Sequence, residues 1–372
     1  SYYDSNWDLL LDQIDWDKDK EGILLSFSGA AYTLGQITSI GLPKTVQEDG
    51  ANGLKVQGAD NGYDMSKSSS FGFAPLMAAT WNKKLLHEIG NAFGQESIQN
   101  GINGWYCPAI NLHRSQFNGR VFEYYSEDPV LSGKLASEVI SGAGDSGMTC
   151  YVKHFALNDT DTGRDQLSNF WADEQTMREI YMKPFEIAIK EAKTTIKYTA
   201  DNNGNTKTKV IRATTGVMPA QNCIGTTMGH VNYNLLTNVL RKEWGFQGMV
   251  ISDYWVWGKN NIRDLAIRSG CDAYLCMNVP SLWTLEDYTS PSSRNAMRNA
   301  IHNIGYTVAN SNAMQKVAPG SFFSYDMSPW ESWLIIADVL IIVLEIGGIV
   351  WIVLRSKKAK KHPELYKNSK IV

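Results

Sequence analysis

The sequence is poor in three features that would place it in common classes of protein. It has five cysteines in 372 residues and no Cys-x-x-Cys pair, so buried free thiols are expected rather than a disulfide framework. No metal or cofactor motif stands out, and we predict neither a metal site nor a cofactor. An excess of positive charge is absent before the C-terminal tail. Residues 1–354 carry −9 while the whole chain carries −3, so nucleic acid is not an expected partner.

No internal repeat or low-complexity linker interrupts residues 1–325, where short apolar runs alternate with helix-like stretches. Strands are expected within 41–48, 105–112, 148–157, 214–222, 248–255 and 272–277, and helices within 82–100, 129–144, 173–193, 233–243 and 296–310. This alternation predicts an α/β fold with a parallel sheet. At this length we expect a TIM-type (β/α)8-like barrel.

Polar side chains stand at or just beyond the carboxyl ends of the expected strands. They are Asp49, Arg114, Lys153, His154, Asn222 and Asp253. In a barrel of this type the carboxyl ends of the strands meet at one rim, where active sites lie. The sequence therefore predicts a site at that rim.

Residues 194–212 read as a β-hairpin with a turn at Asn203-Gly204. They follow an expected helix and precede an expected strand, which places them on the face opposite the predicted site. We interpret them as an accessory or docking element.

One long apolar run lies near the C-terminus. Residues 333–354 number 22 and would span about 33 Å as a helix, which matches a bilayer core. The segment 355–372 follows with a net charge of +6. By the positive-inside rule we expect a single-pass protein of the cell membrane, in contact with membrane lipid. Its domain 1–325 would be extracellular, 326–332 juxtamembrane, and the basic tail 355–372 cytoplasmic.

Two carboxylates interrupt the apolar run. Asp338 and Glu345 are seven residues apart and lie near one helix face. A carboxylate at membrane depth is costly, so each either reaches the interface, takes up a proton or contacts a second helix. Gly347 and Gly348 would permit close approach of such a helix partner.

Four segments share their order and spacing with one enzyme family. They are EDGANGL (48–54), NLHRSQFNGRVFEYYSEDP (111–129), KHFALNDTDTGR (153–164) and LTNVLRKEWGFQGMVISDYW (236–255). Over residues 41–277 they resemble the catalytic barrel of family 3 glycoside hydrolases, β-glucosidase-like. The resemblance implies a retaining exo-β-glycosidase that removes the non-reducing terminal sugar from oligosaccharides or glycosides.

The resemblance also assigns roles to residues. It makes Asp253 the nucleophile, and it places the sugar against Asp49, Arg120, Lys153, His154, Gln221 and Tyr254. Gln221 stands where the family usually has a tyrosine. Lys153 and His154 are expected to supply positive potential beside Asp253. Arg164 and Asp161 are expected to brace their loop, and Glu127 and Asp128 to be structural.

The acid/base residue of the family has no counterpart in this chain. In most multidomain members it is a Glu from a separate sandwich domain, for which residues 278–325 leave no room. Single-domain members use a His on the loop that here spans 158–172, which contains none. The chain begins at Ser1, and some members carry the sandwich before the barrel. We therefore expect a domain-permuted member in which an N-terminal segment or a partner chain carries the acid/base Glu.

Two alternatives remain open. A carbohydrate-binding or scaffold protein with a decayed site is favoured by Gln221 and by the absent acid. It is opposed by the intact Asp253, Lys153, His154 and Arg120. A family member specific for xylose or N-acetylglucosamine would differ only in substrate, and the motifs do not separate these sugars.

Overall fold

The computed structural model describes residues 1–56, 67–164, 168–199, 203–254, 261–314, 327 and 329–366. The chain divides into two units, Ser1–Lys316 and Val317–Val372, which we describe separately. The expected domain end at residue 325 and the last two cations of the basic tail, Lys367 and Lys370, lie outside the described residues.

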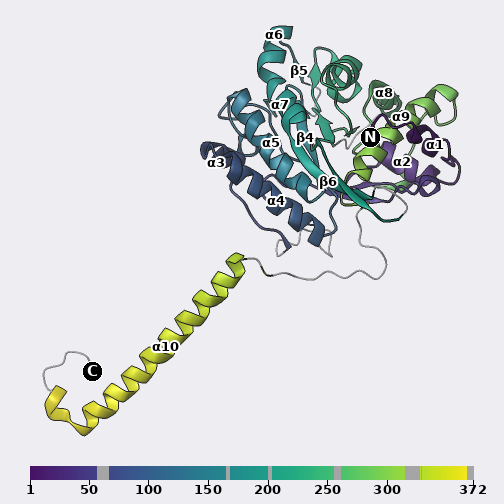
Figure 1. Cartoon of the computed structure of the whole chain (residues 1–372). Helices are drawn as coiled ribbons and strands as arrows, with labels where there is room; N and C mark the ends of the chain where they lie inside the picture. Colours follow the sequence, from purple (N-terminus) through teal and green to yellow (C-terminus); the bar gives the residue numbers. More distant parts are fainter. Residues whose placement is uncertain are drawn as a thin grey trace. The chain divides into compact units, whose positions relative to one another are not determined.

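The first unit is built on a six-stranded sheet (Figure 1). Its strands, in spatial order, are β1 (Thr33–Leu34), β2 (Thr45–Glu48), β3 (Gly104–Trp105), β4 (Thr149–Phe155), β8 (Gly216–Pro219) and β11 (Met249–Val250). All neighbours pair in parallel except β1 and β2, which are antiparallel. The predicted α/β fold with a parallel sheet is thus confirmed.

The expected barrel of eight parallel strands is not what the described residues form. Only ten residues join β1 to β2, too few for a helical crossover, so these two strands pair antiparallel. Irregular segments connect the two edges of the sheet. Ile251 forms a parallel bridge with Ala273, and the Ala30 N–H donates to the Tyr274 carbonyl at 3.0 Å. The result is a partly regular, curved sheet of six strands.

Most expected helices are present close to their predicted bounds. They are α4 (Lys83–Gln99), α5 (Pro129–Asp145), α7 (Lys183–Glu191), the π-helical η7 (Asn234–Glu243) and α9 (Pro291–Ala309). The helix predicted over 173–193 is broken into α6 (Glu174–Thr176), a π-helical turn η5 (Met177–Tyr181) and α7. Pro184 lies in the first turn of α7, and a proline lacks the N–H that a continuous helix would need there.

Several shorter elements complete the first unit. They are α1 (Asn6–Leu11), α2 (Lys20–Ser28), η1 (Thr38–Ile40), α3 (Ala74–Ala79), η3 (Val121–Glu123), β5 (Asn169–Phe170), β9 (Cys223–Ile224), β10 (Thr227–Met228), η6 (Gly229–Val231), α8 (Asn261–Ser269) and η8 (Pro280–Leu282). The expected strand over 105–112 ends early. Pro108 has no N–H to give to a ladder, and pairing resumes only where Ala109 bridges Lys153.

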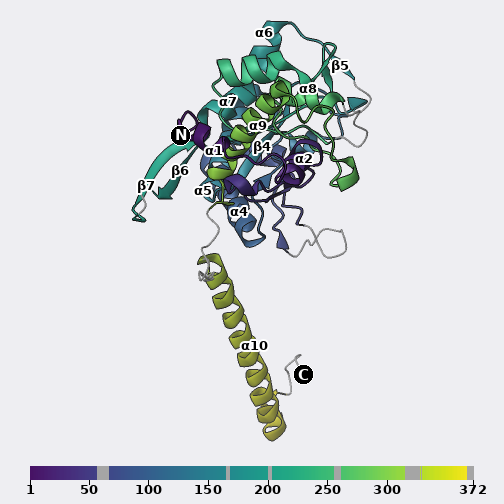
Figure 2. The same cartoon turned by 90° about the vertical axis from the view of Figure 1, so that its right-hand side faces the viewer.

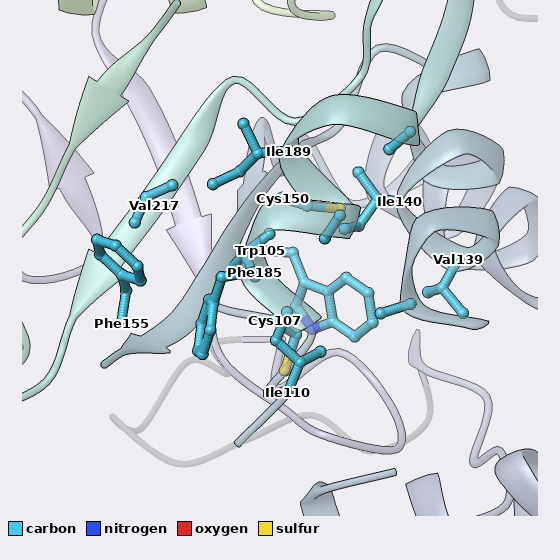
Figure 3. Packing of buried hydrophobic residues seen from close by; sticks show 14 of the residues in the cluster. Trp105, Cys107, Ile110, Val139, Ile140, Cys150, Phe155, Phe185, Ile189 and Val217 are labelled. Carbon is cyan, nitrogen blue, oxygen red and sulfur yellow. The ribbon is translucent and has the colours of Figure 1, made fainter. Parts of the chain in front are cut away.

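A large apolar core lies between the sheet and the helices α4, α5 and α7 (Figure 3). Trp105 stacks on Phe93 with ring centroids 4.3 Å apart, and Phe155 packs on Phe185 at 5.3 Å. The five cysteines are buried free thiols, as the sequence predicts; four of them, Cys107, Cys150, Cys271 and Cys276, belong to this cluster. At the start of α5 the Asp128 carboxylate accepts hydrogen bonds from two backbone N–H groups, which confirms its structural role as a helix cap.

The predicted hairpin is also confirmed. It consists of β6 (Lys193–Thr199) and β7 (Thr206–Arg212), which pair in register over seven residues each. The root of the hairpin contacts segments that precede β4 and β11: Thr194 donates to Asp145 at 2.8 Å, and Arg212 donates to the Gly245 carbonyl at 2.8 Å. It therefore lies at the amino ends of the parallel strands, opposite the rim where the site was predicted.

The second unit contains the helix α10 (Pro329–Lys361), which includes the whole predicted span 333–354, and a short turn, η9 (Pro363–Tyr366). By length and composition α10 is able to cross a membrane, and its residues are unburied within the protein.

Candidate active site

The first group of the site follows β2 directly. Asp49 lies at the carboxyl end of this strand, in a turn that Gly50 makes possible. Gly50 has a φ of +124°, and a Cβ at this position would lie 1.9 Å from the Gly53 carbonyl oxygen, so a side chain does not fit. The Asp49 carboxylate accepts hydrogen bonds from the Gly50 N–H at 2.9 Å and from the Lys153 ammonium at 3.0 Å.

Lys153 is the buried charge at the centre of the site. It lies on β4, and only 5% of its side chain is exposed. Its Nζ is 3.0 Å from Asp49 and 3.6 Å from Glu123. Burial alone would lower the pKa of Lys153, but these two carboxylates outweigh it and raise the pKa above its ordinary value. Lys153 is therefore a firmly charged donor.

Glu123 is a member of the site that the sequence reasoning missed. It is 5% exposed at the end of η3, where one carboxylate oxygen accepts from Arg120 Nε and the other faces Lys153. Its place three residues after Arg120, within the quoted NGRVFE segment, is the signal that could have found it. Glu123 holds two of the predicted sugar-binding cations in fixed positions.

Arg120 connects Glu123 to His154, the residue that follows Lys153 on β4. Besides Glu123, its guanidinium contacts Asp161 at 3.4 Å and donates to His154 Nε2 at 2.9 Å. Because an arginine only donates, Nε2 is the unprotonated nitrogen of the ring, by inference from this contact.

His154 does not supply the positive potential expected of it. Burial, and then the charges of Arg120, Lys153 and Arg164, hold its pKa well below the ordinary range, so the imidazole is neutral. Its Nε2 lies 3.8 Å from the Asp253 carboxylate. The positive charge beside Asp253 comes instead from Arg164, whose guanidinium lies 2.8 Å from its Oδ2.

Asp253 stands just beyond β11 with 8% of its side chain exposed. Arg164 donates to its Oδ2 at 2.8 Å, and the Tyr254 backbone N–H donates to its Oδ1 at 2.7 Å. Arg164 also contacts Asp161 at 3.0 Å. The expectation that Arg164 only braces its loop was therefore incomplete, because it also binds the carboxylate predicted to be the nucleophile.

The remaining predicted residues divide into two groups. The Gln221 amide donates to the Tyr254 carbonyl at 3.2 Å, so these two residues lie together beside Asp253. Arg114 and Asn222 do not join the ion-pair cluster. The exposed Arg114 guanidinium lies over the Tyr181 ring at 5.4 Å, and the buried Asn222 amide contacts the Cys223 carbonyl at 3.4 Å.

A further buried carboxyl group, that of Asp159, lies in the segment after β4. Asp159 is 5% exposed, and its Oδ1 accepts from the Leu112 N–H, while its Oδ2 contacts no partner among the described residues. Burial raises its pKa to about 7.

The site thus consists of carboxylates and cations that lie together at the carboxyl ends of β2, β4 and β11, most of them buried. Asp253 accepts hydrogen bonds on both carboxylate oxygens. Polar groups able to bind hydroxyls lie in the same cluster, namely the charged Asp49, Lys153 and Arg120 and the neutral His154. Such an arrangement suits recognition of a polyhydroxylated ligand next to a fixed nucleophilic carboxylate.

Comparison with known families identifies a match over most of the chain. The family described as "Glycosyl hydrolase family 3 N terminal domain" matches residues 37–298. Beta-glucosidase A of Butyrivibrio fibrisolvens is 34% identical over 244 residues, which cover 64% of this chain and 26% of that protein. A beta-glucosidase of Rhizobium radiobacter is 35% identical over 257 residues, which cover 69% of this chain and 28% of that protein. The chain therefore spans little more than a quarter of the length of these relatives.

Solved structures share the fold. Beta-glucosidase 3B from Thermotoga neapolitana, in complex with glucose, superposes with a TM-score of 0.66 and 28% identity, covering 84% of this chain and 43% of that one. A beta-glucosidase from Kluyveromyces marxianus superposes with a TM-score of 0.69 and 26% identity, covering 90% of this chain and 38% of that one.

The role of Glu123 can be tested by Glu123→Gln. The change leaves Arg120 and Lys153 buried with one counter-charge fewer, so we expect the free energy of unfolding to fall by about 3 kcal/mol. Urea denaturation of the detergent-solubilised chain measures this. The exposed Glu127 is the matched control, and Glu127→Gln should change stability by less than about 0.5 kcal/mol. Equal effects of the two substitutions would contradict the assignment.

Asp159 predicts a pH dependence of stability. Its pKa is about 7 in the folded chain and 3.8 when unperturbed, so between these values the folded state retains a proton that the unfolded state loses. Stability is consequently lost as pH rises through this window. Asp159→Asn keeps an acceptor for Leu112 but does not ionise. Between about pH 5 and pH 8 we expect it to gain roughly 3 kcal/mol relative to the unmodified chain.

Urea titrations at both pH values check this expectation. Asp4→Asn, at an exposed carboxylate, serves as the control and should leave the pH profile unchanged. Parallel profiles for Asp159→Asn and the unmodified chain would show that Asp159 is ionised in the folded state.

Proposed function

This chain belongs to glycosyl hydrolase family 3, and on that basis we propose that it forms the nucleophile-bearing part of a retaining exo-β-glycosidase, β-glucosidase-like. The observation that carries the proposal is the setting of Asp253. Its carboxylate is held by Arg164 and by the Tyr254 N–H, at the strand ends where Lys153 and Arg120 converge. Because the chain covers about a quarter of its relatives, the activity is proposed for the protein together with whatever completes the site.

In the proposed reaction Asp253 attacks C1 of the terminal sugar and forms a glycosyl–enzyme ester while the glycosidic oxygen leaves with a proton. Water then attacks C1, the ester breaks, and the sugar is released with its configuration retained. The donors on both carboxylate oxygens orient Asp253 before attack. This orientation lowers the entropic part of the barrier.

The sugar hydroxyls would be bound by Asp49, Lys153, Arg120 and His154. Asp49 and Lys153 already form a charged acceptor–donor pair 3.0 Å apart, which suits two neighbouring hydroxyl groups. His154 is neutral, so its ring accepts or donates without adding charge. Gln221 lies beside Tyr254 where it would contact the same ring of the substrate. A terminal glucose is the sugar best supported by the relatives, with xylose and N-acetylglucosamine as alternatives.

The acid/base carboxyl is proposed to come from outside this chain. Among the described residues, the carboxylate that shares a partner with Asp253 is Asp161, and it is bound by both Arg120 and Arg164. Both guanidinium groups contact its Oδ1, so we assign this carboxylate to holding the two arginines rather than to proton transfer. An N-terminal segment or a partner chain that carries a Glu over the strand ends would complete the pair of carboxyl groups.

We further propose that α10 anchors the protein in the cell membrane, with the first unit outside and the basic tail inside. The support is the length and apolar composition of α10 and the five cations within 355–361 at its end. We also propose that a sandwich domain precedes the barrel domain, and that a second helix contacts α10 at Asp338 and Glu345.

The nucleophile is tested by labelling. A 2-deoxy-2-fluoro-glucoside with a dinitrophenolate leaving group needs no acid catalyst, so the chain should form a stable adduct on the peptide that contains Asp253. Asp253→Asn should abolish the adduct and lower turnover of activated glucosides by roughly a thousandfold or more. Mass spectrometry of the digest locates the adduct. An adduct on another carboxylate contradicts the assignment, and no adduct at all would support a carbohydrate-binding protein with a decayed site.

The origin of the acid is tested by leaving-group dependence. Without an acid catalyst, the rate of ester formation should fall steeply as the phenol leaving group becomes less acidic. With an acid catalyst, the same change of leaving group should lower the rate only slightly. We expect the purified chain in detergent micelles to show the steep dependence on a series of aryl glucosides, and to hydrolyse cellobiose at a negligible rate. A shallow dependence, or efficient cellobiose hydrolysis, would place the acid within this chain.

A further inference from the structure

The hairpin β6–β7 differs in charge from the rest of the first unit. The segment 193–212 carries a net +4, while the other residues of 1–354 together carry −13. Its described strands hold five cations and no carboxylate: Lys193, Lys197, Lys207, Lys209 and Arg212. The hairpin is therefore a basic element on an acidic body.

The cations of the hairpin are mostly unpaired with acids. Within the described part of the chain, no ion pair joins Lys193, Lys197 or Lys207 to a carboxylate, and all three side chains are exposed. The Lys209 ammonium lies over the Tyr198 ring at 5.3 Å. Val210 is 65% exposed and Tyr198 38% exposed, so apolar and aromatic surface stands among the cations. Figure 2 shows the two strands projecting from the body.

The root of the hairpin and the end of the first unit meet at one turn. Thr194 of β6 contacts Asp145, at the end of α5. After α9, the Asn312 N–H donates to the Gly147 carbonyl at 2.8 Å, and its side chain contacts the Ile102 carbonyl at 3.0 Å. Asp145 and Gly147 are two residues apart, which is at most about 7 Å. Asn312 thus lies beside the root of the hairpin, on the face of the first unit opposite the candidate active site.

We propose that the β6–β7 hairpin binds the anionic headgroups of the membrane that α10 enters, and so keeps the candidate active site facing away from the lipid. The inference rests on the proposed anchoring by α10. The hairpin and Asn312, near the end of the first unit, lie on the same face of that unit, and the hairpin is the basic element of this face.

Charge and chemistry favour a lipid surface over a protein or a second copy of the chain. A second copy of the chain could pair with these cations only where its acidic residues form a patch that matches the hairpin. A surface of anionic headgroups meets all of the cations at once. Tyr198 and Val210 suit the region between headgroups and acyl chains, where aromatic and apolar side chains with polar neighbours are stabilised.

The experiment measures amide hydrogen exchange of the full chain in lipid nanodiscs. One set contains phosphatidylcholine alone, and the other contains about one third phosphatidylglycerol. We expect peptides from 193–212 to exchange roughly tenfold more slowly in the anionic discs at low salt, and this difference to vanish at high salt because surface charges are then screened. Peptides from the candidate active site should exchange equally in both sets.

Two double variants identify the source of the protection. Lys197→Ser with Lys207→Ser removes two hairpin cations and should abolish the lipid-dependent difference. The control Lys84→Ser with Lys183→Ser removes two cations that lie at the starts of α4 and α7, at the opposite end of the body, and should retain the difference. Both variants should fold, which their far-ultraviolet circular dichroism checks.

The outcomes separate this inference from the anchoring. Chains that enter the discs but exchange alike in both lipids would overturn the hairpin contact and leave the anchoring in place. Chains that do not co-elute with discs would overturn the anchoring, and the hairpin contact with it.

Discussion

The buried ammonium of Lys153 is the group on which the arrangement of the site depends. With 5% of its side chain exposed, its charge is tolerated because Asp49 lies at 3.0 Å and Glu123 at 3.6 Å. These partners come from β2 and from η3, so one charge fixes the relative positions of three segments. Glu123 extends the constraint to Arg120, Arg120 to His154, and His154 approaches Asp253 at 3.8 Å. The separation of Asp253 from the groups proposed to bind the sugar is thus set by linked ion pairs and hydrogen bonds rather than by any single strand.

The first unit has two ends with different physical character. At the carboxyl ends of the strands, acids and cations are balanced against each other in a partly enclosed cluster. At the amino ends, the β6–β7 hairpin carries cations that no acid within the described residues neutralises. A parallel sheet produces this division, because the loops that follow its strands all lie at one edge and the loops that precede its strands all lie at the other. An insertion at the amino ends alters the surface there without disturbing the groups around Asp253.

The sequence predicted much of this fold because the helices carry local signals. Asp128 and Pro129 begin α5 as a cap and a first-turn proline, and Asn203-Gly204 marks the turn of the hairpin. The predicted parallel sheet is confirmed but the eight-stranded barrel is not, since short connections and irregular edge contacts, such as that of Ala30 with Tyr274, depend on which segments meet in space. The motif residues at the strand ends were predicted to converge; those of the ion-pair cluster do, but Arg114 and Asn222 do not.

The sequence by itself determined the family of the first unit, the order of its α and β elements, the hairpin and the apolar length of α10. Each of these is encoded in neighbouring residues or in motifs of fixed spacing. Only the tertiary structure decided that Glu123 pairs with both Arg120 and Lys153, that Arg164 reaches Asp253, and that His154 is neutral. These facts depend on burial and on charges brought together from distant parts of the chain, and the energy of a buried charge is set by all of its neighbours at once.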